Sequence, residues 1–198
     1  MSSGAPIIVS GFDDYAATLK KEYVILDPEE RAQMIWQDAT NIAFASGLDV
    51  VEDAGLLAEV SGLVEWPVVL MGEIDQEFLE LPPEVLQTSM REHQKFFSVR
   101  DTESGKITRF ITVANRETAD EGATILAGNQ KVLSARLADA KFFWENDLRV
   151  AQNDGLTAWT ARLENVTFHN KLGSQKDRID RIVDLAGDLS IATSADAG

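Results

Sequence analysis

The segment from Leu81 to Phe97, LPPEVLQTSMREHQKFF, constrains the fold of this chain more than any other segment. The run Pro82-Pro83-Glu84 is typical of a helix start, because proline fits the first helical turn, where its missing N–H is not needed. Near its end the segment contains four polar side chains: Arg91, His93, Gln94 and Lys95. The two phenylalanines that follow them are expected to begin an apolar strand. The segment therefore predicts a short helix that leads at once into a strand.

Composition excludes several classes of protein. With 198 residues the chain can form one large domain or two small ones with a real core. It has no cysteine, so disulfides, thiolate zinc sites and cysteine nucleophiles are excluded. It has no apolar run near 18 residues, and its first residues lack the pattern of a signal peptide. We expect a cytoplasmic protein that does not span a membrane.

The net charge of −15 is distributed unevenly along the chain. Residues 1–90 contain 3 basic and 17 acidic side chains, whereas residues 91–198 contain 15 basic and 16 acidic ones. The acidity is therefore concentrated before Arg91, and the second half can present local basic faces. The global charge does not exclude RNA binding, because phosphate contacts depend on where the cations lie. A solvated acidic surface is the simpler interpretation of the first half.

The first 115 residues show a mixed pattern of helices and strands. Asp27-Pro28-Glu29-Glu30 is a helix start with a capping residue, a proline in the first turn and a capping-box glutamate, and Gly47 fits the helix end. A hairpin is indicated by the polar, glycine-containing loop at residues 101–105. Strands are expected at residues 7–10, 23–26, 67–71, 96–100 and 107–114, and further helices at 13–21 and 54–63.

The remaining residues read as helical. Leu133, Leu137, Ala140 and Trp144 recur at helical spacing with Phe143 beside them, so we expect Phe143 and Trp144 in the core. A short helix is expected near residues 156–165. A last helix from Ser174 is expected to bury four apolar residues: Ile179, Ile182, Val183 and Ala186.

These elements predict an α+β fold. A mixed α/β part with a small sheet and flanking helices, residues 1–115, precedes a helical region, residues 116–198, that packs on it.

The sequence predicts no catalytic and no metal-binding residues. The only histidines, His93 and His169, are 76 positions apart and have no partner at a recognised metal spacing. No G-x-S-x-G elbow and neither of the two glycine-rich phosphate-binding motifs occurs. We therefore expect no ATP site, metal site or serine nucleophile in this chain.

The polar end of the first segment offers candidates for contact with RNA. Arg91 and Lys95 lie four residues apart, so on a helix they share a face and could straddle a phosphate. His93 and Gln94 could donate to a base edge or a ribose hydroxyl. On the residues alone, the favoured alternative is structural: Arg91 pairs with an acidic neighbour, Glu84 or Glu92, and His93 caps the helix end.

Asn129, Lys131 and Arg136 form a second candidate group. Arg136 lies close to the apolar stripe, where a buried charge must be paired, so a pair with Asp139 or a neighbouring element is the simpler interpretation. The cations of the last helix alternate with aspartates, which favours a solvated face.

Four stretches resemble the β subunit of the bacterial heterotetrameric glycyl-tRNA synthetase. They are GLVEWPVVLMGEIDQEFLELPPEVLQTSMREHQKFF at residues 62–97, FITVAN at 110–115, GNQKVLSARLADAKFFWENDL at 128–148 and LENVTFHNKLGSQKDRI at 163–179. They occur in the family's order, and the resemblance extends from about residue 7 to residue 189. Because the family's β subunit is several times longer, the chain looks like an internal piece of it.

The resemblance implies a non-catalytic part of a class II ligase that attaches glycine to tRNA(Gly). It implies an α subunit partner in an α2β2 complex, with ATP and Mg²⁺ used by that α subunit, and an inactive fragment on its own. The seven candidates for tRNA contact match the family's segments by position: Arg91, His93, Gln94, Lys95, Asn129, Lys131 and Arg136. A purely structural spacer is the alternative, and an editing-like hydrolase is disfavoured because no nucleophile or metal site is found.

Overall fold

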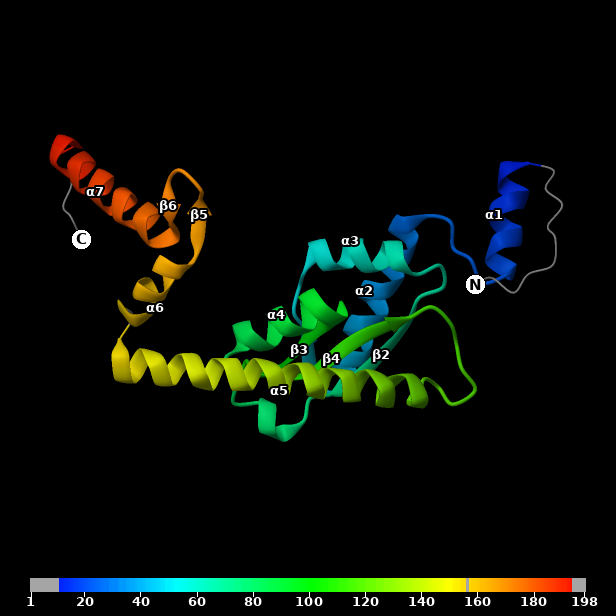
Figure 1. Ribbon diagram of the computed structural model, residues 1–198. Helices are drawn as coiled ribbons and strands as arrows, with labels where there is room; N and C mark the ends of the chain where they lie inside the picture. Colours follow the sequence, from blue (N-terminus) through cyan, green and yellow to red (C-terminus); the bar gives the residue numbers. More distant parts are fainter. Residues whose placement is uncertain (1–10, 156, 194–198) are drawn as a thin grey trace. The chain divides into compact units, whose positions relative to one another are not determined.

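The computed structural model describes residues 11–155 and 157–193 (Figure 1). Contacts between Cα atoms divide the chain into two compact units, residues 1–141 and 142–198, and each is described by itself. The domain boundary expected after residue 115 stays a prediction. The strand expected at residues 7–10 lies outside the described residues.

The first unit contains the helices α1 (Phe12–Lys21), α2 (Pro28–Ala45) and α3 (Ala54–Leu63). The predicted start of α2 is confirmed, because Oδ1 of Asp27 accepts a hydrogen bond of 2.9 Å from the N–H of Glu29. Its end is confirmed too, since Gly47 follows the last turn with a φ of +71°, a conformation that suits glycine. Glu30 forms an ion pair of 2.7 Å with Lys20 of α1.

Four antiparallel strands form the sheet of this unit: β1 (Leu48–Val50), β2 (Val68–Glu73), β3 (Phe97–Asp101) and β4 (Ile107–Ala114). Their spatial order is β1-β3-β4-β2, so the β3–β4 hairpin occupies the centre. The predicted hairpin is confirmed. Its loop is held by Asp101, whose Oδ1 accepts from the N–H of Ser104 at 2.7 Å, and these Ser104 hydrogen bonds lower the pKa of the Asp101 carboxyl.

Helices cover both faces of the sheet (Figure 1). Neighbouring residues of β4 show this, because Ile111 packs with residues of α2 and α3 while Phe110 packs with residues of α4 (Pro83–Gln94) and α5 (Ala123–Asp154). The first cluster contains Ile35, Ala39, Ala43, Leu56, Val60, Val69, Phe97 and Val99, among others. The second contains Phe78 of η1 (Gln76–Phe78), Leu86, Met90, Phe96, Leu133 and Leu137, among others. The α+β fold is thereby confirmed.

The packing of Phe110, on the central strand β4, depends on a glycine in the neighbouring edge strand β2. A Cβ atom at Gly72 would lie 2.4 Å from Cζ of Phe110, so the ring occupies the space that a side chain on β2 would need. Phe110 also stacks on Phe96, with ring centroids 4.8 Å apart. Phe96, which follows the end of α4, therefore packs on the middle of the sheet.

One strand expected in the first unit does not form. Residues 23–26 are an extended connection without sheet pairing, which begins at Tyr23 with a left-handed φ of +62°. Ile25 is buried, and its N–H donates to the carbonyl of Glu65 at 2.9 Å. The apolar run YVIL therefore reflects the burial of Ile25 in a connection, and the strand prediction is wrong.

The second unit contains the end of α5 and five further elements. They are α6 (Thr157–Arg162), η2 (Leu163–Asn165), β5 (Thr167–His169), β6 (Gly173–Ser174) and α7 (Gln175–Thr193), with β5 and β6 paired as a small hairpin. The helices expected near residues 156–165 and after Ser174 are confirmed.

The burial expected in this unit is wrong. Phe143 is 63% exposed and Trp144 38% exposed. In α7, Ile179 is half-buried, while Ile182, Val183 and Ala186 are exposed. Helical spacing identifies an apolar face correctly, but it carries no information about what covers that face.

Candidate functional site

The polar cluster Arg91–Lys95 belongs to the segment Leu81–Phe97, called the signature segment below, and lies where α4 ends and β3 follows. Lys95 ends the helix in the left-handed conformation, with a φ of +57°. Its N–H donates to the carbonyl of Arg91 at 3.3 Å, and the N–H of Phe96 donates to the carbonyl of Met90 at 3.1 Å. These bonds satisfy carbonyls of the last turn and direct the chain into the buried strand. The prediction that a helix leads at once into a strand is confirmed.

Both cations of this cluster point to α3. Nε of Arg91 lies 3.2 Å from Oδ2 of Asp53, and Nζ of Lys95 lies 2.9 Å from Oε1 of Glu59. Asp53 is also the N-cap of α3, since its Oδ1 accepts from the N–H of Leu56 at 2.9 Å. The two pairs therefore connect the end of α4 to the start and the middle of α3.

These partners only partly match the structural alternative derived from sequence. Arg91 does approach Glu92, at 3.8 Å, but its nearer partner is Asp53, and Glu84 is not an ion-pair partner of it. His93 is exposed and does not cap the helix end: its side chain makes no hydrogen bond or ion pair with the described residues. The N-cap role of Asp53 could have been read from an Asp that directly precedes a helix. Its pairing with Arg91, across 38 positions, has no local sequence signal.

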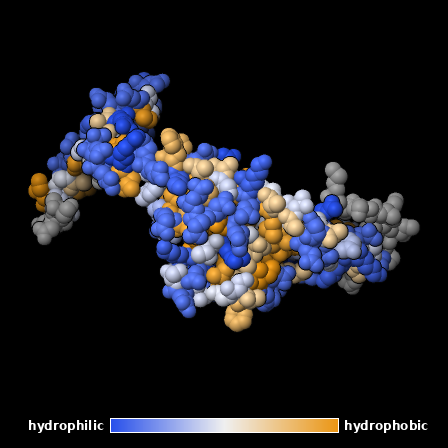
Figure 2. Space-filling view, turned by 90° about the horizontal axis from the view of Figure 1, so that it is seen from below, coloured by the Kyte–Doolittle hydropathy of each residue, from blue (hydrophilic) through white to orange (hydrophobic). Residues whose placement is uncertain are grey.

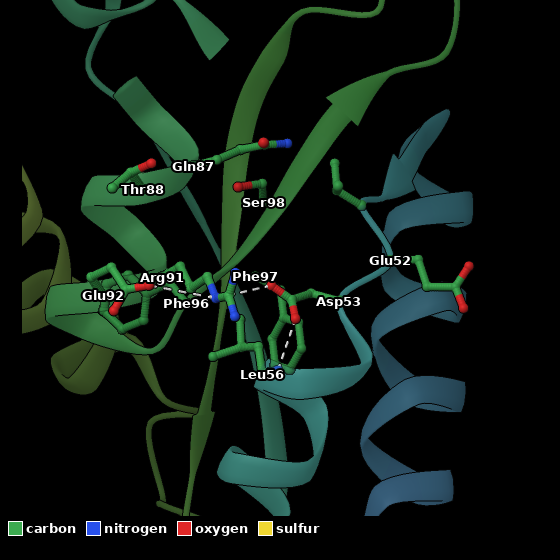
Figure 3. A pocket seen from close by; sticks show the side chains of 11 residues that line it. Glu52, Asp53, Leu56, Gln87, Thr88, Arg91, Glu92, Phe96, Phe97 and Ser98 are labelled. Carbon is green, nitrogen blue, oxygen red and sulfur yellow. Dashed lines mark hydrogen bonds and ion pairs between the residues drawn. The ribbon is translucent and has the colours of Figure 1, made fainter. Parts of the chain in front are cut away.

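A pocket of about 180 Å³ opens beside this cluster, between the start of α3, one side of α4 and the start of β3 (Figure 3). Its apolar floor includes Leu56, Phe96 and Phe97. Polar side chains also line it, namely Gln87, Thr88 and Ser98, together with the charged residues Glu52, Asp53, Arg91 and Glu92. Two of these carboxylates, those of Asp53 and Glu92, already lie within 4 Å of the Arg91 guanidinium, so the pocket is a poor site for a phosphate or another anion.

The second candidate group lies on α5 and divides into one fixed and two free side chains. Nδ2 of Asn129 donates to Oγ1 of Thr112 on β4 at 3.4 Å, which ties the helix to the sheet. Lys131 and Arg136 are exposed, and neither forms an ion pair with any residue that the structure describes. The expected pair of Arg136 with Asp139 is therefore not formed. Five helical positions separate the two cations by about 140° around the axis, so they do not share one face.

The start of α5 is held by an acidic cap. Oδ2 of Asp120 accepts from the N–H of Thr124 at 2.9 Å, and Oδ1 accepts from the N–H of Gly122 at 3.3 Å. Hydrogen bonds from Thr118 and Thr124 hold the pKa of the Asp120 carboxyl well below its ordinary value. This perturbed carboxyl is thus explained by a structural role at a helix N-terminus.

The described residues contain neither a membrane-spanning helix nor a cluster of metal ligands. No helix among residues 11–155 and 157–193 is long and apolar enough to cross a membrane. Within the same residues, no group of three His, Asp or Glu side chains is arranged to hold a metal ion.

Comparison with known proteins identifies the family. A family model described as glycyl-tRNA synthetase beta subunit matches residues 1–197. The glycine–tRNA ligase β subunit of Ruegeria sp. (strain TM1040) is 71% identical over 194 residues, which cover 98% of this chain and 28% of that protein. The β subunit of Dinoroseobacter shibae is 70% identical over 190 residues, 96% of this chain and 26% of the relative, and that of Rhodospirillum centenum is 47% identical over 192 residues.

The match covers nearly all of this chain, but the chain spans only about a quarter of the length of these curated relatives. The resemblance seen in four separate stretches is confirmed over the whole chain. The chain belongs to the glycyl-tRNA synthetase beta subunit family.

Proposed function

We propose that this chain is a non-catalytic part of a glycyl-tRNA synthetase β subunit that helps to bind and orient tRNA(Gly) while glycine is attached to it at the expense of ATP. The observation that carries this proposal is the family match over residues 1–197. In the proposed enzyme, an α subunit is the partner in an α2β2 complex and uses ATP and Mg²⁺. The chain alone is inactive, and the complex works in the cytoplasm.

Unpaired cations are the best candidates for the contact with tRNA. The electrostatic part of RNA binding comes from lysine and arginine side chains that are not already neutralised, and Lys131 and Arg136 of α5 are exposed and unpaired within the described residues. His93 is exposed as well and could donate to RNA. Contact with tRNA stays a prediction for the other four candidates, Arg91, Gln94, Lys95 and Asn129. To contact tRNA, Arg91 would have to leave Asp53, and Lys95 would have to leave Glu59.

Steady-state aminoacylation tests the role of the α5 cations. Lys131→Ala and Arg136→Ala are introduced into a full-length β subunit that carries this sequence and is assembled with its α subunit. Each variant is expected to raise the KM for tRNA by roughly threefold to tenfold with little change in kcat, and to reduce the salt slope of tRNA binding by about one. Lys106→Ala is the matched control, because Lys106 is exposed but lies 3.5 Å from Glu80. An unchanged KM and salt slope in folded variants would refute the RNA contact at these positions.

A structural spacer without RNA contact is the second candidate, and the ion pairs of the signature segment favour it. Arg91 and Lys95 both bind carboxylates of α3, as side chains that fix a fold do. If this is their only role, Arg91→Ala and Lys95→Ala reduce the free energy of unfolding and leave the KM for tRNA unchanged. A raised KM with unchanged stability would assign them to RNA instead.

A further inference from the structure

The last helix exposes an apolar face over most of its length. The hairpin holds only its beginning: the N–H of Gln175 donates to the carbonyl of Val166 at 2.8 Å, and the Arg178 guanidinium lies 4.7 Å from the centre of the Phe168 ring. Every residue from Arg181 to Leu189 is exposed. Hydrophobic side chains consequently lie open at the surface of the second unit, as the space-filling view shows (Figure 2).

Four of the five large apolar residues that are exposed on α7 are gathered on one side, and the fifth, Ile191, lies among the aspartates about 180° from Ile182. At 100° per residue, Ile182, Val183, Leu185 and Leu189 fall within an arc of about 160°. They are 54%, 63%, 58% and 54% exposed, respectively. The opposite side carries three aspartates one turn apart, Asp180, Asp184 and Asp188. A helix with this division of apolar and acidic faces is typical of one that packs against a second apolar surface and turns its charges to water.

We propose that this face of α7 (Ile182, Val183, Leu185 and Leu189) is a docking surface for the part of the β subunit that lies outside these 198 residues. The curated relatives are matched over 26–28% of their length, so roughly three quarters of such a subunit consists of other chain. A surface on the same polypeptide is present at a high effective concentration, which favours it over a separate molecule. The partner surface is therefore apolar and intramolecular, and the aspartates of α7 face away from it.

Hydrogen exchange of the α7 amides tests this proposal. Two proteins are compared: the 198-residue chain, and a full-length β subunit in which this chain replaces the matching stretch of the Ruegeria protein, 71% identical to it. Amides of residues 181–189 are expected to exchange at least about tenfold more slowly in the full-length subunit, because covered helices open less often. Amides of the buried strand β4 provide the internal reference for folding.

Substitutions on the two faces of α7 supply the matched pair. Leu185→Lys and Leu189→Lys in the full-length subunit are expected to return the exchange of residues 181–189 to the rate of the 198-residue chain. Lysine is a good helix former, so the effect would report lost packing. Asp184→Lys, on the acidic side, is expected to leave the slow exchange intact.

Three results would overturn the proposal. Equal exchange rates in the two proteins would show that no other part of the subunit covers α7. Slow exchange in the 198-residue chain at every concentration would show that residues 1–141 cover it. Exchange that slows as the concentration of that chain rises would show that a second copy does.

Discussion

Nε of Arg91, in the last turn of α4, lies 3.2 Å from Oδ2 of Asp53, while the other oxygen of the same carboxylate caps α3. One side chain thus satisfies the backbone of one helix and the charge of another. The two contributions differ in size: an N-cap is worth about 1 kcal/mol, whereas an ion pair as exposed as this one is worth less. The cap therefore dominates, and the ion pair sets the position of α4 against α3.

Replacement of Asp53 separates these two contributions. Asp53→Ala removes both and is expected to lower the free energy of unfolding by about 1–2 kcal/mol. Asp53→Ser keeps a capping oxygen and is expected to lower it by only a few tenths of a kcal/mol. Urea unfolding of the chain measures the difference. Equal losses in the two variants would mean that the pair with Arg91 stabilises the fold more than the cap does.

The left-handed residue at the end of α4 predicts a stabilising substitution. An L-residue other than glycine pays roughly 1 kcal/mol or more for this conformation, so Lys95→Gly relieves strain at φ +57°. It also removes the half-exposed pair with Glu59, and the net gain is expected to be up to about 1 kcal/mol. Glu59→Ala removes the pair alone and is the matched control. The interpretation fails if Lys95→Gly is the less stable of the two in thermal unfolding.

Two glycines should respond in opposite ways to alanine. Gly72→Ala places a Cβ against the Phe110 ring and is expected to cost about 1–3 kcal/mol, because the stacked aromatic core must shift. Gly62→Ala, in α3, meets no atom within 4 Å and is expected to add up to about 1 kcal/mol through helix propensity. Chemical denaturation of both variants checks the pair. A Gly72→Ala variant as stable as the parent would show that Phe110 moves freely.

Acid stability should depend on the cap of α5. The pKa of Asp120 is lowered in the folded state, so its carboxylate stabilises the fold above the ordinary value of 3.8, and this contribution is lost as the pH falls below it. Asp120→Asn removes this dependence. Between about pH 5 and pH 2 the variant is expected to show a smaller fall of Tm than the parent, although it starts from a lower one. Identical slopes of Tm against pH would refute the role of this carboxylate.

Local signals in the sequence predicted most of the first unit. The start of α2 at Asp27-Pro28 and the hairpin around Asp101–Gly105 each depend on residues close together in the chain, and both are confirmed. β1 was missed because its three residues, Leu48–Val50, are too few to show a period. The strand predicted at residues 23–26 fails for a related reason, because an apolar run with one buried residue, Ile25, resembles a short strand in the sequence.

Less of the candidate site could be predicted from the sequence. The composition of the Arg91–Lys95 cluster was evident, but its partners Asp53 and Glu59 lie on another helix, and no local pattern pairs them. The cover of an apolar helix face is likewise a property of the neighbouring surface. Leu133, Leu137 and Phe143 follow the same helical pattern, yet the two leucines are buried and Phe143 is exposed.

The strand order β1-β3-β4-β2 has a consequence for synthesis. Both edge strands are complete by Glu73, whereas the central hairpin against which they pair ends at Ala114. As the chain leaves the ribosome from its N-terminus, β1 and β2 emerge first and have no partner until β3 and β4 follow. The strongly acidic composition of residues 1–90 keeps these early segments in mutual repulsion and in solution during that interval. The acidic half of the chain is thus the half that carries both edge strands, which are made before the middle of the sheet.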